Sequence, residues 1–234
     1  MKISKKKKEM VRKNILQSAI DLIAKQGYKK STMSQIARKA NVAEATIYNY
    51  FPTKEHLLFA YYHELQLATK EQILQTEEFH TFSLKEQIEF LIHTQLTLLA
   101  KDREFIQRIY EEMHYHFYYH PGLQDGHDVF LGMIEEMLDI AVEAGEIEPL
   151  PFKKGVVHLL GDFVFGVMYY WLNDESEHFS DTTVMIDKSL DVIYAVLRSG
   201  LLAKTYNLFE FIIKKHILNH MESGGEFNKR RFEA

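Results

Sequence analysis

The amino-acid sequence predicts an all-α protein in which a three-helix N-terminal head carries a larger helical body. Apolar residues recur at helical spacing along nearly the whole chain, and no segment shows the alternation expected of a strand. Hydrophobic residues make up 46% of the 234 positions, which is enough for a packed core. Residues 1–54 hold thirteen Lys and Arg against three acids, whereas the remainder holds fifteen against thirty. A basic segment joined to an acidic one is typical of a nucleic-acid-binding head on a body that does not bind nucleic acid.

The start of the head combines a lysine run with an amphipathic helix. Residues 1–8 contain Lys5 to Lys8, and we expect a basic arm that either follows DNA phosphates or is a solvated, disordered end. The spacing of apolar residues predicts a helix over 9–26, and Gly27 would end it as a C-terminal cap.

Two short helices follow. Thr32 and Gln35 match the capping-box pattern, which predicts a second helix over about 33–39. Asn41, which tolerates left-handed backbone geometry, marks a turn before a third helix over about 43–51. Such a pair around a tight turn is a helix-turn-helix, whose second helix fits the major groove of DNA.

The third helix would bury Ile47 and Phe51 and expose the side chains between them. Pro52 ends this helix, and Thr53 would cap a fourth helix that begins at Lys54. The head therefore presents a short helix with one apolar anchor and a polar outer face.

The run IYNYFPTKEHLL at residues 47–58, after IAxxANVxxxT at residues 36–46, resembles the N-terminal domain of the TetR family of transcriptional regulators. The resemblance covers residues 9–69, and it implies a sequence-specific DNA-binding regulator. It also implies contacts with the DNA backbone, which fix register without reading sequence. The residues that match these positions are Thr32, Thr46, Tyr48, Tyr50 and Lys54.

Base reading would fall to the exposed residues of the third helix and the turn before it. Asn49 could read adenine, and Glu44 could accept a hydrogen bond from cytosine. The alternative for Glu44 is that it only stabilises the helix start. The family often has Gly and Ser or Thr where this chain has Asn41 and Ala43, so no DNA contact is assigned to Ala43.

The body, residues 70–221, reads as a succession of helices, and residues 222–234 are expected to be a flexible tail. Ser83 and Glu86 form a second capping-box pattern. The expected helices cover about 54–77, 84–101, 103–119, 125–144, 153–173, 182–198 and 202–221.

The resemblance implies that this body binds an effector and forms a two-fold homodimer, so that the operator would be pseudo-palindromic. Segments 153–173 and 182–198 would form the dimer face, although the core of a single chain could use the same glycines. His158 and Asp162 lie four apart and are expected to pair. The candidate interface residues are Gly155, His158, Asp162 and Gly166.

Aromatic residues are concentrated in 103–119 and 153–173, which predicts either plain core or an apolar cavity for a small lipophilic effector. The candidate cavity residues are Phe105, Tyr110, Met113, Phe117, Phe163 and Tyr169.

Some features of the sequence also suit two other classes of protein. Residues 155–172 approach the length of a membrane span and would suit a membrane-associated adaptor, but Asp162 near their centre favours a helix buried within soluble protein. For an enzyme on a helical scaffold, the chain has no nucleotide-binding loop, nucleophile motif or cysteine. His116 with His120 and His216 with His220 have metal-ligand spacing, but no carboxylate completes either pair. We therefore expect a cytoplasmic repressor released by its ligand, or an activator, with neither a metal nor a cofactor.

Overall fold

The computed structural model describes residues 4–113 and 120–214, apart from the side chain of Met113, and every regular element in these ranges is a helix. The head contains α1 (Lys5–Gln26), α2 (Met33–Lys39) and α3 (Glu44–Tyr48). The body follows with α4 (Lys54–Gln75), α5 (Leu84–Ala100), α6 (Arg103–Met113), α7 (Gln124–Glu143), α8 (Lys153–Leu172), α9 (Ser180–Arg198) and α10 (Leu201–Ile212). Within the described residues, the short 3₁₀ turns η1 (Phe79–Thr81), η3 (Pro121–Leu123) and η4 (Glu177–Phe179) lie between these helices. The all-α prediction is confirmed.

The first helix begins earlier than the sequence suggested. Ser4 caps α1 by accepting a hydrogen bond from the backbone N–H of Lys7, so Lys5 to Lys8 form its first turn and not a separate arm. The arm assigned to residues 1–8 is wrong for this stretch, since lysine is a good helix former and Ser4 satisfies an N–H at the helix start. Gly27 ends the helix at a positive φ of 86°, as predicted.

The third helix is shorter than expected and covers Glu44–Tyr48 in place of 43–51. Beyond it the chain tightens, because Asn49 N–H bonds to Thr46 C=O at 3.1 Å and Tyr50 N–H bonds to Ile47 C=O at 3.0 Å. Pro52 explains this ending, since the residue before a proline is disfavoured in helical geometry. Ile47 and Phe51 are buried, as predicted.

A continuous apolar core connects the head to the body. The inward faces of α1, α2 and α3 surround Ile15, Ile36 and Ile47, and α6 contributes Phe105 and Ile109 to the same cluster. The head therefore does not pack alone, because part of its core belongs to a helix that is about sixty residues away in sequence.

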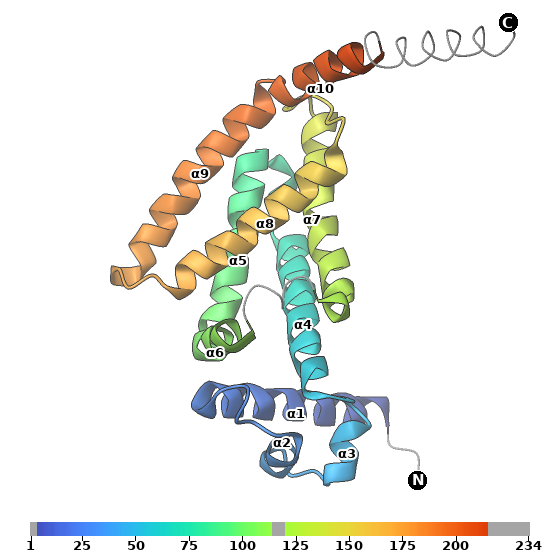
Figure 1. The fold of residues 1–234 in the computed structure, drawn as a ribbon, viewed down its shortest axis with the longest axis vertical. Helices are drawn as coiled ribbons and strands as arrows, with labels where there is room; N and C mark the ends of the chain where they lie inside the picture. The colour runs from blue at the N-terminus through green and yellow to red at the C-terminus, as the bar shows by residue number, and fades with distance from the viewer. Residues whose placement is uncertain (1–3, 114–119, 215–234) are drawn as a thin grey trace, which may run out of the picture.

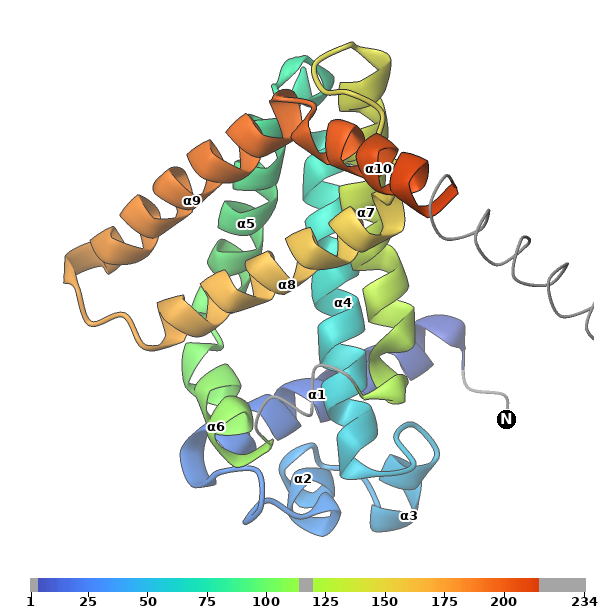
Figure 2. The same ribbon diagram turned by 45° about the horizontal axis from the view of Figure 1, so that its top comes forward.

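In the body, α4 runs upward from the head and packs against α5 and α7 (Figures 1 and 2). Helix α8 crosses this layer, α9 returns beside α5, and α10 projects away from the opposite end of the molecule to the head (Figure 1). Their apolar faces meet in a second core around Leu91, Ile134 and Leu160.

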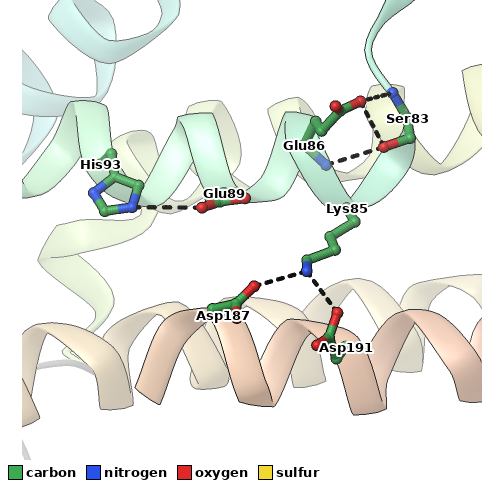
Figure 3. Close-up of polar contacts among 7 residues, drawn as sticks. All are labelled: Ser83, Lys85, Glu86, Glu89, His93, Asp187 and Asp191. Carbon is green, nitrogen blue, oxygen red and sulfur yellow. Dashed lines mark hydrogen bonds and ion pairs between the residues drawn. The ribbon is translucent and has the colours of Figure 1, made fainter. Parts of the chain in front are cut away.

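Polar contacts fasten α9 to α5 (Figure 3). Lys85 lies between Asp187 and Asp191, with Nζ–Oδ1 distances of 2.8 and 2.5 Å. Ser83 and Glu86 form the predicted capping box at the start of α5. The position of α9 on the body is thus fixed by charge as well as by apolar packing.

Helix α8 departs from the expectation that it would be buried within the protein. By length and composition α8 is long and apolar enough to cross a membrane, and 39% of its apolar 18-residue stretch is buried in the protein. Leu160 and Val164 face the core, whereas Leu159 on the opposite face is 70% exposed. The other helix ends lie within a few residues of the predicted ones, and the stretches expected at 114–119 and 215–221, with the tail 222–234, fall outside the described residues.

Candidate nucleic-acid interface and ligand cavity

The helix-turn-helix is built from local hydrogen bonds that the sequence pattern encodes. Thr32 and Gln35 form a reciprocal capping box at the start of α2. Asn41 takes a left-handed φ of 55° in the turn, and Asn14 of α1 holds the end of α2 by donating to the carbonyl of Ala40 at 2.7 Å. These contacts fix the angle at which α3 leaves the turn.

Helix α3 has one buried anchor and an open outer face. Ile47 is fully buried, whereas Glu44, Tyr48 and Asn49 are exposed. Thr46 and Tyr50 are half-buried, and the exposed side chain of Thr32 lies at the start of the neighbouring α2. The predicted DNA-facing residues of α3 therefore stay accessible while the apolar side holds the helix in place.

The start of α3 carries no side-chain cap. Ala43 occupies the capping position and offers no hydrogen-bonding group, as the sequence implied. Glu44 stands in the first turn, where a negative charge favours the positive end of the helix dipole. Its exposed carboxylate suits both that role and base reading.

Lys54 is placed differently from the other predicted DNA contacts. Its ammonium group donates to the backbone carbonyls of Tyr28 at 2.6 Å and Ser31 at 2.9 Å, and it lies 3.9 Å from the centre of the Tyr28 ring. Burial lowers the pKa of Lys54, although nearby Glu55 opposes this effect. Lys54 thus binds the turn between α1 and α2, a role that the match to a phosphate-contacting position did not predict.

Thr53 stands at the predicted capping position of α4, but its side chain makes no cap hydrogen bond. Its hydroxyl oxygen instead lies 2.9 Å from Nδ1 of His56.

A small apolar cavity of about 80 Å³ lies in the body where α4, α5, α6 and α8 meet. Phe105 and Tyr110, both predicted, line it. Phe163 instead packs against the main core of the body, and Tyr169 stacks on Tyr110 at 4.7 Å while remaining 46% exposed. The side chains of Met113 and Phe117 lie outside the described residues.

Most of the cavity wall was not identified from the sequence. Helix α4 supplies a stripe at helical spacing, α8 adds Phe165 and Met168, and Leu99 and the apolar side chains of α6 complete the lining. The spacing within α4 could have indicated an inward face, although not a cavity. The residues that α4 contributes are Leu58, Tyr61, Tyr62 and Leu65.

Polar groups are sparse at the cavity. The hydroxyl of Tyr61 donates to the Asp102 carboxylate at 3.0 Å, and burial together with this carboxylate raises the pKa of Tyr61. The hydroxyl of Tyr62 lies 3.2 Å from Nδ1 of His127 on α7. An apolar wall with a few fixed polar groups suits a lipophilic ligand.

The predicted interface residues share the outer surface of α8. Gly155, His158, Asp162 and Gly166 are all exposed. A Cβ added at Gly166 would meet no atom within 4 Å, so packing within this chain does not require glycine there. Exposed apolar side chains accompany them, namely Leu159 and Tyr170 of α8 and Val184, Val192 and Val196 of α9.

Of the two histidine pairs with metal-ligand spacing, for which no metal was expected, only His120 lies within the described residues. His120 caps η3 by accepting from Gly122 N–H at 3.0 Å and stacks on Phe59 at 4.8 Å. His116 and the pair His216 and His220 lie outside the described residues, within which no group of three potential metal ligands occurs.

Comparison with known proteins agrees with this architecture. Residues 15–61 match the family described as bacterial regulatory proteins of the tetR family, and residues 87–212 match the tetracyclin repressor-like C-terminal domain. The fatty acid metabolism regulator protein of Bacillus subtilis is 44% identical over 50 residues, which are 21% of this chain and 26% of that protein. The transcriptional repressor KstR of Rhodococcus jostii is 47% identical over 47 residues, which are 20% of this chain and 22% of the repressor. The matched stretch thus spans about a quarter of these curated relatives.

Solved structures share the fold over a longer stretch. The regulator FadR from Bacillus subtilis in complex with stearoyl-CoA has a TM-score of 0.59 at 23% identity, covering 80% of this chain and 97% of that one. A TetR-family regulator from a Rhodococcus species has a TM-score of 0.62 at 16% identity, covering 79% and 99%. The match at residues 87–212 alone covers more than half of the chain. The chain belongs to the TetR family of DNA-binding transcriptional regulators, which are not enzymes.

Proposed function

We propose that this protein is a cytoplasmic homodimeric repressor, which binds a pseudo-palindromic operator through two copies of α3 and leaves it when a small lipophilic effector enters the body. The observation that carries the proposal is the exposed outer face of α3, held by buried Ile47, on a head that shares its core with a cavity-lining helix.

The DNA contacts follow from the exposure of each side chain. Tyr48 and Asn49 are free of the core, and Thr46 and Tyr50 are half-buried beside them. Hydroxyl groups suit phosphate oxygens and fix the register, whereas the Asn49 amide suits a base edge. We assign backbone contacts to Thr32, Thr46, Tyr48 and Tyr50, and base reading to Asn49 with Glu44. Lys54 supports the turn between α1 and α2, and it can contact a phosphate only while it is bound to that turn.

The effector class is suggested by the cavity wall and by one relative. The cavity lining is almost entirely apolar, and the related regulator from Bacillus subtilis was solved with stearoyl-CoA. A volume of about 80 Å³ holds only a few heavy atoms, so a long acyl chain must displace part of the wall. This requirement favours release by movement, because a ligand that fits only the displaced arrangement shifts the population away from DNA binding.

A second copy of the chain would cover the outer face of α8 and α9. Leu159 is 70% exposed and Val192 is 65% exposed, and exposed apolar surface on neighbouring helices marks interaction sites. Open space at Gly166 allows another helix to approach closely. The same contact would explain why α8 is apolar on a face that its own chain leaves uncovered.

The test combines selection of an operator with release by candidate ligands. The purified chain is used to select duplexes from a random pool, and the enriched sequence is expected to contain two inverted half-sites. Binding to that duplex is then titrated with stearoyl-CoA and with free coenzyme A as the matched control. We expect release by stearoyl-CoA alone. Enrichment of no duplex refutes the proposal, and release by neither ligand refutes the acyl-chain effector.

A further inference from the structure

A groove separates α1 of the head from the body helices above it. Helix α1 lies across the lower ends of α4 and α6 (Figure 1). The floor of this head–body groove is one side of α1, whose lining residues recur at helical spacing and are Lys13, Leu16, Gln17 and Ile20. The opposite wall comes from α4 and from the end of α5. The hollow between these walls has a volume of about 300 Å³, which suffices for a small-molecule site.

The head–body groove continues past the corner between α5 and α6. A second hollow of about 430 Å³ extends along α1 as far as Ala24. The two hollows share four lining residues, namely Gln17, Ile20, Lys101 and Asp102. The groove can therefore accept an elongated group that lies along α1.

The groove adjoins the apolar cavity of the body. Tyr61 and Leu65 of α4 line both the cavity and the first hollow, and Phe105 of α6 lines both the cavity and the second hollow. The hydroxyl of Tyr61 donates to the Asp102 carboxylate at 3.0 Å, and its ring packs edge-on against Phe105 with 5.0 Å between the ring centres. A molecule in the groove is thus one residue away from the cavity.

The charge in the first hollow is not balanced. Lys13 and Lys101 are exposed, and neither side chain makes a hydrogen bond or an ion pair with another residue in 4–113 or 120–214. The acids of this hollow are both partnered, since Glu64 is paired with Arg12 and the Asp102 carboxylate accepts from a tyrosine hydroxyl. The uncompensated charge is therefore positive, and it suits a carboxylate or a phosphate.

We propose that the head–body groove binds the anionic head of an acyl ligand whose tail occupies the apolar cavity. This inference rests on the proposed function, because it takes a lipophilic effector as its starting point. Lys13 and Lys101 bind the carboxylate or phosphate of the ligand, and the tail enters the cavity past Tyr61, whose ring turns away from Asp102. The groove supplies the charge and the volume that a cavity of about 80 Å³ lacks.

Three ligands with one tail test the role of the two lysines. Dodecanoyl-CoA, dodecanoate and methyl dodecanoate carry phosphates, a carboxylate and a neutral ester, and calorimetry below their micelle concentrations measures their binding. The double variant Lys13→Gln/Lys101→Gln should weaken binding of an anionic ligand by about tenfold, because each exposed ion pair contributes roughly two- to fivefold. It should weaken binding of methyl dodecanoate by less than about twofold. A loss confined to dodecanoyl-CoA assigns the groove to phosphate, and a loss confined to dodecanoate assigns it to carboxylate.

Lys25→Gln/Lys70→Gln is the matched control. It removes the same charge from exposed positions on α1 and α4 that do not line the groove. We expect it to change the binding of each ligand by less than about twofold, since unpaired charges at a distance are screened by salt. Thermal unfolding confirms that both double variants are folded.

A single thiol reports on the groove itself. The chain has no cysteine, and Gln17 is exposed and lines both hollows, so Gln17→Cys places one thiol there. A saturating amount of the tighter-binding anionic ligand should slow alkylation of this thiol by iodoacetamide at least about tenfold, because the reaction needs access to the sulfur. Alkylation of Lys25→Cys, on the same helix outside the groove, should keep its rate.

The outcomes separate this inference from the proposed function. A natural chain that binds none of the three ligands refutes the acyl-chain effector, and the groove site with it. If the natural chain binds an anionic ligand and Lys13→Gln/Lys101→Gln binds it as tightly as the control variant, the groove site alone is refuted. Alkylation of Gln17→Cys at an unchanged rate in the presence of bound ligand also refutes the groove site alone.

Discussion

At the scale of single residues, the chemistry of two exposed side chains at the end of α3 distinguishes the two kinds of DNA contact that we propose. Tyr48 can donate one hydrogen bond from a hydroxyl, and that geometry suits any phosphate. Asn49 carries both a donor and an acceptor, and the pair matches the edge of adenine. The buried side chain of Ile47 fixes the rotation of α3 about its axis, so that Tyr48 and Asn49 stay exposed.

The first prediction compares these two neighbours. Tyr48→Ala should weaken binding to all duplexes by a similar factor, whereas Asn49→Ala should change the preferred base at one position of each half-site by about 1–3 kcal/mol. Selection from a random duplex pool measures both. An unchanged base preference in Asn49→Ala would remove its reading role.

The second prediction concerns Lys54, whose ammonium binds two backbone carbonyls inside the head. Lys54→Met keeps much of the side-chain volume but leaves these carbonyls without their charged donor. We expect the free energy of unfolding to fall by about 1.5–3 kcal/mol, as measured in urea. Tyr48→Ala, at an exposed site, should change it by less than about 0.5 kcal/mol. Equal stability of the two variants would mean that Lys54 serves DNA and not the turn.

Sequence reasoning failed at Lys54 for a physical reason. The capping boxes at Thr32 and Ser83 involve residues three apart, so short-range spacing encodes both partners, and both boxes are confirmed. The partners of Lys54 are more than twenty residues away, and only the packing of α1 against α4 brings them within reach.

At the scale of elements, the corner between α8 and α9 is organised by one carboxylate. Asp174 accepts from the backbone N–H and hydroxyl groups of Ser176 and Thr182, which joins the end of α8 to the start of α9. The hydrogen bonds from Ser176, followed by those from Thr182, hold the pKa of Asp174 well below its usual value. Asp174 is buried, and its carboxylate accepts all four of these hydrogen bonds inside the protein.

A pH dependence follows from that depressed pKa. The stabilisation by Asp174 is present above about pH 4, the unfolded value, and is lost as the pH falls through the lower folded value. Asp174→Asn should therefore lower stability at pH 7, and its deficit relative to the natural chain should shrink as the pH falls below about 4. Urea unfolding from pH 7 to pH 3 measures the difference. A deficit that does not depend on pH would show that the charge contributes nothing.

The cavity could not be predicted from the sequence of any single helix. The apolar spacing of α4 indicates an inward face, but whether Tyr61 and Leu65 meet packed side chains or open space depends on α5, α6 and α8. Phe105 and Tyr110 were found because aromatic residues are concentrated in α6. Phe163 was misplaced since it lies on a different side of α8 from the cavity-lining Phe165 and Met168, and only the packing of that helix decides which core each side joins.

At the scale of the whole molecule, the proposed homodimer would set the separation of its two copies of α3. Two glycines on exposed helix faces allow a matched comparison, since a Cβ at Gly166 or at Gly132 meets no atom within 4 Å of the same chain. Gly166→Phe should shift sedimentation from dimer towards monomer, because it fills the space that a partner's α8 would occupy. Gly132→Phe on α7 should leave the dimer intact. A dimer unaffected by Gly166→Phe would place the interface elsewhere.

We propose above all that two chains bind one duplex through their basic heads. Sedimentation of the protein with its selected duplex, repeated at 50 and 200 mM salt, tests this claim directly. We predict two chains per duplex and an affinity that falls by roughly 10³ to 10⁵ between these concentrations, as expected for six to ten phosphate contacts. A single chain per duplex, or an affinity that does not respond to salt, would contradict the account.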